Sequence, residues 1–393
     1  MSDETKASAT VSDYLRWRGD LTFAQDGFNE VDNLLLCIIS YIKLENIPRL
    51  RSFDPKDAMP MGDVCRLLTE EDEQLGLSTL DYIPLMRQAA ETPRFREVSL
   101  FAFESLHDED RQMQFAAVSF LLPDGSVYAA YRGTDMTIVG WQEDFNMSFL
   151  SAVPAQVKAA EYAGAVARAC PRRALRIGGH SKGGNLAAWA AVHLDEKLQR
   201  QRLIAAYNND GPGFSRDLVD TPSYQAVADR LFTYIPASSI VGVLLEHAED
   251  YEVVDSTARS IMQHEPLSWC VEGPRFVHLG QRSQLGQLSD GVLREWIGSR
   301  EREQFSRAFF DILSRGGRTK TLEDLRSGGL AAGAALIREY AGADEEKKKI
   351  ISEIFRRLAV DVKDELMKAA GAGVRRAGES ILATGQAIAD LRK

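Results

Sequence analysis

The hydrophobic pattern along the 393 residues begins with a helical segment and continues with strands. Residues 28–47, "FNEVDNLLLCIISYIKLENI", carry apolar residues at helical spacing and predict an amphipathic helix that packs on a core. Between about 96 and 132 the apolar residues form short runs, "EVSLFAFES", "QFAAVSFLL" and "SVYAAYRG", which predict strands. The turn sequence "PDG" at 123–125 should join the last two strands into a hairpin.

From residue 155 onward, predicted helices and strands alternate. The alanine-rich stretch 155–170 and the stretch "NLAAWAAVHL" (185–194) favour helix. Further strands are predicted at 202–210, 231–238 and 250–256. This alternation indicates an α/β fold with a largely parallel sheet covered by helices on both faces.

Beyond about residue 285 only helical patterns remain. We therefore divide the chain into a sheet-containing domain over residues 1–285 and a helical C-terminal extension over 286–393. Within the extension, 344–370 predicts an amphipathic helix with basic residues beside its apolar stripe, a pattern that suits peripheral contact with a membrane surface. Its many acidic residues favour instead packing on the domain, or on a second copy of the chain in a homo-oligomer.

Composition narrows the class of protein. The formal net charge of -10 gives no basic field, so a nucleic-acid partner is not expected. The longest early apolar run, 34–42, is well short of the ~20 residues that span a bilayer, and the acidic N-terminus does not resemble a signal peptide. We expect a cytoplasmic protein without a transmembrane segment. The four cysteines are far apart and form no metal or redox motif, so buried free thiols are expected.

The stretch "IGGHSKGG" (177–184) contains G-x-S-x-G between a predicted strand and a predicted helix. In such a turn the small flanking residues avoid a collision, and the hydroxyl of Ser181 is forced outward as a nucleophile. The N-terminus of the following helix would stabilise an oxyanion beside it. Phosphate-binding and dinucleotide-binding glycine motifs do not match. The remaining alternative is a turn whose glycines only let the helix pack closely on the strand.

Two signatures here are similar to those of class 3, fungal-type lipases: "YRGTDMTIVGWQEDF" (131–145) and "GGHSKGGNLAAWAA" (178–191). The stretches "DYLRWRGDLTFAQDGFNEVDNLLL" (13–36), "YNNDGPGF" (207–214) and "IMQHEPLSW" (261–269) resemble more closely the Mbeg-like family of the α/β-hydrolase group. The resemblance implies a lipase-like α/β-hydrolase fold with Ser181 as nucleophile. It also implies that the main-chain N–H groups of Thr134 and Lys182 form the oxyanion hole, and that Trp141 and Asp144 are structural.

A serine nucleophile needs a base, which in α/β-hydrolases follows the serine and the acid along the chain. His247, His264 and His278 lie downstream of the helix behind Ser181. His264 is the favoured base because it lies in a loop after the predicted strand 250–256, and such loops surround the active edge of the sheet. His247 and His278 remain alternatives.

The acid departs from the lipase pattern. Class 3 lipases carry an aspartate after the strand that corresponds to 231–238, but this chain has Ser238 and Ser239 there. Asp210, at the end of the preceding predicted strand, is the favoured substitute. Asp255, Glu249 and Asp250 remain alternatives, and Ser239 could orient the histidine directly.

Together these residues predict a serine esterase that hydrolyses a small-molecule or lipid ester through an acyl-enzyme, without a metal or organic cofactor. A lipid-like substrate, and hence a role in lipid metabolism, follows from the resemblance alone. An acyltransferase with the same intermediate and a non-catalytic scaffold that has lost its acid are the alternatives. The ammonium of Lys182 is predicted either to favour an anionic group on the substrate or to extend into solvent.

Overall fold

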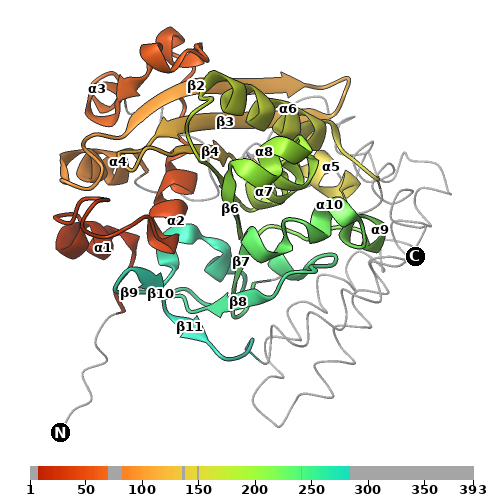
Figure 1. Ribbon diagram of the computed structural model, residues 1–393. Coiled ribbons are helices and arrows are strands. Elements are labelled where there is room, and N and C mark those ends of the chain that lie inside the picture. Colours follow the sequence, from red (N-terminus) through yellow and green to blue (C-terminus); the bar gives the residue numbers. More distant parts are fainter. Residues whose placement is uncertain (1–7, 70–81, 135–137, 148–149, 240, 284–393) are drawn as a thin grey trace, which may run out of the picture. The chain divides into compact units, whose positions relative to one another are not determined.

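The computed structural model describes residues 8–69, 82–134, 138–147, 150–239 and 241–283 (Figure 1). The chain falls into two compact units, and residues 1–135 and 151–286 make up the first. The second unit contributes one described helix, α5 (Ile138–Asn146). The predicted C-terminal extension 286–393, with its helix over 344–370, and the side chain of Trp141 lie outside the described residues. The division at residue 285 therefore stays a prediction.

Within the described part of the first unit, nine strands form one sheet in the order β1-β2-β3-β4-β5-β6-β7-β8-β11. Strands β4 to β8 are parallel, and the strands on both sides of them are antiparallel. The strands are β1 (Met59–Pro60), β2 (Ser99–Asp108), β3 (Met113–Leu121), β4 (Val127–Tyr131), β5 (Leu175–His180), β6 (Leu203–Asn209), β7 (Leu231–Pro236), β8 (Tyr251–Val254) and β11 (His278–Leu279). A separate ribbon pairs β9 (Val271–Glu272) with β10 (Arg275–Phe276).

Helices cover both faces of this sheet, as the alternation of elements predicted (Figure 1). One group packs on the face of Tyr128 and Ala130: α1 (Val11–Arg18), α2 (Glu30–Ile39), α3 (Met61–Cys65) and α4 (Tyr82–Glu91). The other packs on the face of Val127, Ala129 and Tyr131 and includes α6 (Pro154–Ala169), α7 (Lys182–His193), α9 (Arg216–Val219) and α10 (Pro222–Gln225). Helix α8 (Glu196–Gln201) follows α7. The predicted hairpin joins β3 to β4, and Gly125 supplies the positive φ of its turn.

Helix α2 is shorter than the predicted segment 28–47. It begins after Asn29, whose side chain accepts hydrogen bonds from the first amides of the helix. It ends at Ile39. The amide of Ser40 is shared between the carbonyls four and three residues back, and those of Tyr41 and Ile42 bond to carbonyls three residues back. Both side chains remain buried in the core, so the apolar sequence pattern continues beyond the end of the helix.

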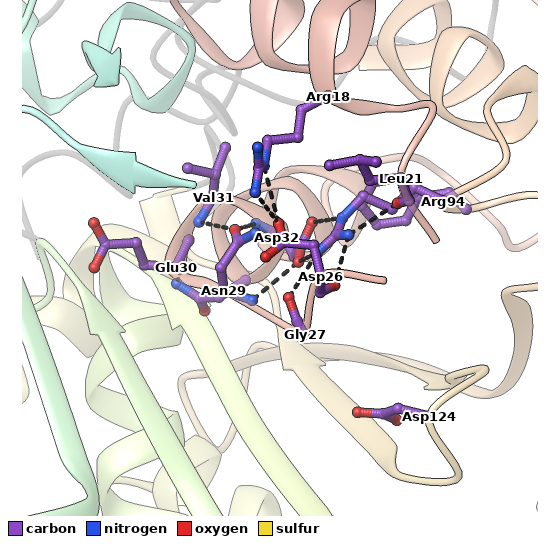
Figure 2. A network of polar contacts seen from close by, with 12 residues as sticks. Arg18, Leu21, Asp26, Gly27, Asn29, Glu30, Val31, Asp32, Arg94 and Asp124 are labelled. Atoms are coloured by element: carbon purple, nitrogen blue, oxygen red, sulfur yellow. Dashed lines mark hydrogen bonds and ion pairs between the residues drawn. The ribbon is translucent and has the colours of Figure 1, made fainter. Parts of the chain in front are cut away.

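A buried ion pair fixes the start of α2 (Figure 2). The guanidinium of Arg94 donates to both carboxylate oxygens of Asp32, at 2.7 and 2.5 Å, and both side chains are fully buried. Burial lowers the pKa of Arg94, but the hydrogen bond and charge of Asp32, together with the charges of Tyr14 and Asp26, leave the pKa raised. Arg94 also donates to three main-chain carbonyls, those of Leu21, Asp26 and Gly27. The loop before α2 is therefore bound to the segment after α4.

All four cysteines are free and buried, as expected. No helix within the described ranges combines the length and the apolar character needed to cross a membrane.

The ring of His278, in β11, predicts a pH-dependent contribution to stability. Its Nε2 lies 2.8 Å from Glu30 Oε1, and its Nδ1 bonds to Glu252. Burial alone would lower the pKa of His278, but the two carboxylates raise it by more than burial lowers it. The pKa therefore lies above the ordinary value of 6.5. The stabilisation is therefore fully present below about pH 6.5 and is lost as the pH rises through the raised pKa of the folded state.

We expect His278→Asn to reduce the free energy of unfolding more at pH 6 than at pH 9, as measured by urea denaturation. His107→Asn, which alters an exposed histidine, is the control and should have a similar, small effect at both pH values. An equal loss at both pH values for His278→Asn would contradict the charge argument.

Candidate active site

Ser181 is the single residue between β5 and α7. Its φ of 58° and ψ of −132° lie outside the regions that residues other than glycine ordinarily adopt. A Cβ at Gly179 would lie 2.1 Å from the carbonyl of Gly183, so a larger residue cannot replace this glycine without a shift of the main chain. The turn predicted from G-x-S-x-G is therefore present, with a half-buried serine at its apex.

The end of β4 packs against this turn. Tyr131 pairs with Gly179, and a Cβ at Gly183 would lie 2.2 Å from the carbonyl oxygen of Tyr131. Thr134, three residues beyond β4, is half-buried, and Lys182 is the first residue of α7. The predicted oxyanion residues thus follow two neighbouring parallel strands at the same edge of the sheet. The N-terminus of α7 also brings a partial positive charge to this edge.

Asp210 directly follows β6, the neighbour of β5, and its backbone is also left-handed, with φ 54°. Its buried carboxylate contacts three groups. Oδ2 lies 2.6 Å from Nδ1 of His264 and accepts a hydrogen bond from Ser239 Oγ at 2.5 Å, while Oδ1 accepts from the amide of Gly242 at 3.0 Å. The favoured acid and the favoured base are therefore in direct contact. Ser239, the alternative partner for the histidine, donates to Asp210 instead.

His264 ends the short 3-10 helix η6 (Ser260–His264), and its side chain is 17% exposed. Because Nδ1 faces a carboxylate, it carries a proton, so in the neutral form of the ring the lone pair lies on Nε2. The ring lies 4.6 Å, between centroids, from that of His180, the residue before Ser181. This tautomer leaves Nε2 able to accept a proton, and the contact with His180 places the ring next to the turn that holds Ser181.

The alternative histidines have other partners. Nδ1 of His247 lies 3.1 Å from Glu249 Oε1, and its Nε2 lies 2.8 Å from the carbonyl oxygen of Gly242. His278 lies between Glu30 and Glu252, as described above. Neither arrangement brings the ring to Asp210.

The alternative acids are also engaged elsewhere. Glu249 accepts hydrogen bonds from Thr233 and Tyr224 in addition to its contact with His247. Burial alone would raise the pKa of Glu249, but these partners together lower it by more. The pKa therefore lies below its ordinary value. Asp255 accepts from the amide of Ser256, and Asp250 is exposed. The structure thus pairs His264 with Asp210 among the acids that the sequence left open.

Both predictions for the Lys182 side chain are wrong. It is 1% exposed, and its Nζ donates to the main-chain oxygen of Gln114 at 2.9 Å and to Gln114 Oε1 at 2.7 Å. The side chain neither extends into solvent nor offers its charge to a ligand, because the first turn of α7 directs it toward β3. The polar Gln114 within the apolar run "QFAAVSFLL" was the signal that sequence reasoning missed.

Sequence reasoning also missed Tyr41 and His180. The hydroxyl of Tyr41 lies 3.0 Å from Nδ1 of His180, and Nε2 of His180 lies 2.8 Å from the main-chain oxygen of His264. A histidine inside the G-x-S-x-G motif was the available signal. In the described ranges, no group of three or more histidine, cysteine, aspartate or glutamate side chains could hold a metal ion.

The Mbeg1-like family model matches residues 89–314, more than half of the chain. The chain belongs to the Mbeg1-like family. No curated protein matches this Mbeg1-like chain. The sheet order and the serine turn described above give it an α/β-hydrolase fold.

Solved lipase structures also match this Mbeg1-like chain at low similarity. Lip2 lipase from Yarrowia lipolytica is 15% identical, with a TM-score of 0.35 over 64% of this chain and 91% of that one. The Rhizomucor miehei lipase propeptide complex is 16% identical, with a TM-score of 0.32 over 45% and 72%. The N225Q mutant of MDLA from Penicillium cyclopium is 11% identical, with a TM-score of 0.35 over 62% and 83%.

The two adjacent serines of this Mbeg1-like chain give a matched test of the contact with Asp210. Ser239→Ala removes a hydrogen bond to a buried carboxylate and should cost about 1.5–3 kcal/mol of unfolding free energy. Ser238→Ala removes a bond to the hydroxyl of Ser283 and should cost about 0.5–1.5 kcal/mol. Urea denaturation measures both. Equal losses would show that the carboxylate gives the Ser239 bond no additional strength.

Proposed function

We propose that the protein is a serine hydrolase that cleaves carboxylic esters through an acyl-enzyme on Ser181. The observation that carries this proposal is the 2.6 Å contact between His264 Nδ1 and Asp210 Oδ2, next to the turn that holds the serine. In α/β-hydrolases the order along the chain is nucleophile, acid, base. Asp210 fits this order because it lies between Ser181 and His264.

In the proposed reaction, Nε2 of His264 accepts the proton of Ser181 Oγ as this oxygen attacks the ester carbonyl carbon. The main-chain N–H groups of Lys182 and Thr134 stabilise the tetrahedral oxyanion. Collapse breaks the bond to the alcohol, which leaves with the proton from His264. Water, deprotonated by the same ring, then releases the carboxylic acid. Asp210 holds the tautomer of His264 and stabilises the imidazolium.

The proposed substrate is an ester with a lipid-like acyl group. Two observations support this choice. The sequence signatures around Thr134 and Ser181 are similar to those of class 3 lipases. In addition, Met262, two residues before the proposed base, exposes 59% of an apolar side chain, which suits contact with an apolar substrate.

Labelling with a fluorophosphonate probe tests the nucleophile. The wild-type protein should be labelled and Ser181→Ala should not, because the probe phosphonylates an activated serine hydroxyl. Both should have the same unfolding transition, which controls for folding. A wild-type protein that stays unlabelled would instead support a non-catalytic scaffold.

If the protein is labelled, product analysis with an added alcohol distinguishes a hydrolase from an acyltransferase, because only the acyltransferase forms a new ester with that alcohol.

Substitution of the acid tests its assignment. Asp210→Asn should reduce the rate of labelling by about 10⁴-fold, since an amide does not fix the required tautomer of His264. Asp255→Asn, at one of the alternative acids, should label at close to the wild-type rate. The reverse result, with Asp255→Asn slow and Asp210→Asn unaffected, would reject the assignment.

A further inference from the structure

A chain of buried side chains leads from the end of α2 to the main chain of the proposed base. The Tyr41 hydroxyl lies 3.0 Å from Nδ1 of His180, and Nε2 of His180 lies 2.8 Å from the carbonyl oxygen of His264. Tyr41 and His180 are both buried. Neither residue has a part in the chemical steps described above.

The partners determine which atoms carry protons. A carbonyl oxygen only accepts hydrogen bonds, so Nε2 of His180 must be the donor to His264. Burial, and then the nearby His264 ring, lower the pKa of His180 well below its ordinary value, so the ring is neutral and its Nδ1 is an acceptor. The Tyr41 hydroxyl therefore donates to Nδ1 at 3.0 Å, and the main-chain oxygen of His180, at 3.3 Å, is a second and more distant acceptor. The chain of hydrogen bonds runs in one direction, from Tyr41 through His180 to His264.

Tyr41 also contacts the end of β4. The main chain of Gly133, the residue before Thr134, hydrogen-bonds to the Tyr41 hydroxyl. A Cβ at Gly133 would lie 2.1 Å from that oxygen and 2.7 Å from the carbonyl oxygen of His180. One hydroxyl thus contacts the strand end that leads to the proposed oxyanion hole and the ring next to the proposed nucleophile.

The base needs such support because it lies in a loop. His264 ends the short helix η6 rather than a strand of the sheet. The preceding carbonyl, that of Gln263, accepts from Nε1 of buried Trp269 at 3.0 Å. Two successive carbonyls at the base are therefore held by buried aromatic or imidazole N–H donors. A shift of about 1 Å in such a group can reduce a reaction rate by roughly 100-fold.

On the basis of the proposed function, we propose that Tyr41 and His180 are positioning residues that hold the main chain of His264 at the distance from Ser181 that proton transfer requires. His180 acts through its Nε2–H, and Tyr41 acts by fixing the tautomer and orientation of the His180 ring. Because His180 stays neutral, it adds no like charge beside His264 when that ring becomes an imidazolium.

The test measures inactivation by a fluorophosphonate, which separates the maximal rate of inactivation, kinact, from the probe affinity, KI. His180→Phe keeps a planar ring but removes the donor, and should lower kinact by about 100-fold. Tyr41→Phe should lower kinact by about 10-fold, as for one neutral hydrogen bond. KI should change by less than about twofold in both. The double variant should be no slower than His180→Phe, because both residues act through one contact.

Tyr162→Phe is the matched control, since it deletes a buried hydroxyl that donates to the carbonyl oxygen of Ala102 at 2.7 Å. Tyr162→Phe should retain the wild-type kinact. If His180→Phe does not fold, the comparison of Tyr41→Phe with Tyr162→Phe still tests the proposal. A wild-type kinact for Tyr41→Phe, or losses that multiply in the double variant, would overturn the positioning role alone. A wild-type protein without labelling at Ser181 would overturn the proposed function itself.

Discussion

The candidate site depends on the parallel pairing of β5 with β6. The register places His180 opposite Asn209, so the next residue of each strand leaves the sheet at the same level. Those residues are Ser181 and Asp210, and both adopt a left-handed backbone. The amide of Ser181 also donates to the carbonyl oxygen of Asn209 at 2.9 Å, which ties one turn to the other strand. Each such conformation costs on the order of 1–3 kcal/mol and persists only where the surroundings impose it.

This pairing explains how the candidate site can hold a carboxylate beside His264 although none directly follows β7. A carboxylate at the end of β6 reaches His264 because the sharp turn at Asp210 redirects its side chain. Ser239, after β7, donates to the same oxygen of Asp210 that contacts His264. The loop after β7 contributes a second donor through the amide of Gly242. The carboxylate thus follows β6, and the hydrogen-bond donors that hold it follow β7.

Helix α2 connects the ion pair in Figure 2 to the strand that carries the serine. The Asp32–Arg94 pair fixes its first turn. One residue later, Asn33 donates to Asn209 Oδ1 at 2.8 Å, and Asn209 donates to the carbonyl oxygen of Gly179 at 2.9 Å. These buried amides are costly unless they are paired, so their mutual bonds select one position of α2 on the sheet. The same helix then ends just before Tyr41, next to the site.

The sequence allowed the prediction of features that depend on neighbouring residues. Periodicity predicted the strands and helices, and the glycines around Ser181 predicted its turn, because both act over a few positions. The contact of Tyr41 with His180 spans 139 residues and follows no local pattern. The direction of the Lys182 side chain is a similar case. A residue at the first turn of a helix can point toward solvent or back toward the sheet, and its own neighbours along the chain do not distinguish the two. Its partner does: an amide such as that of Gln114, buried in an apolar strand, requires polar contacts, and Lys182 Nζ provides one of them.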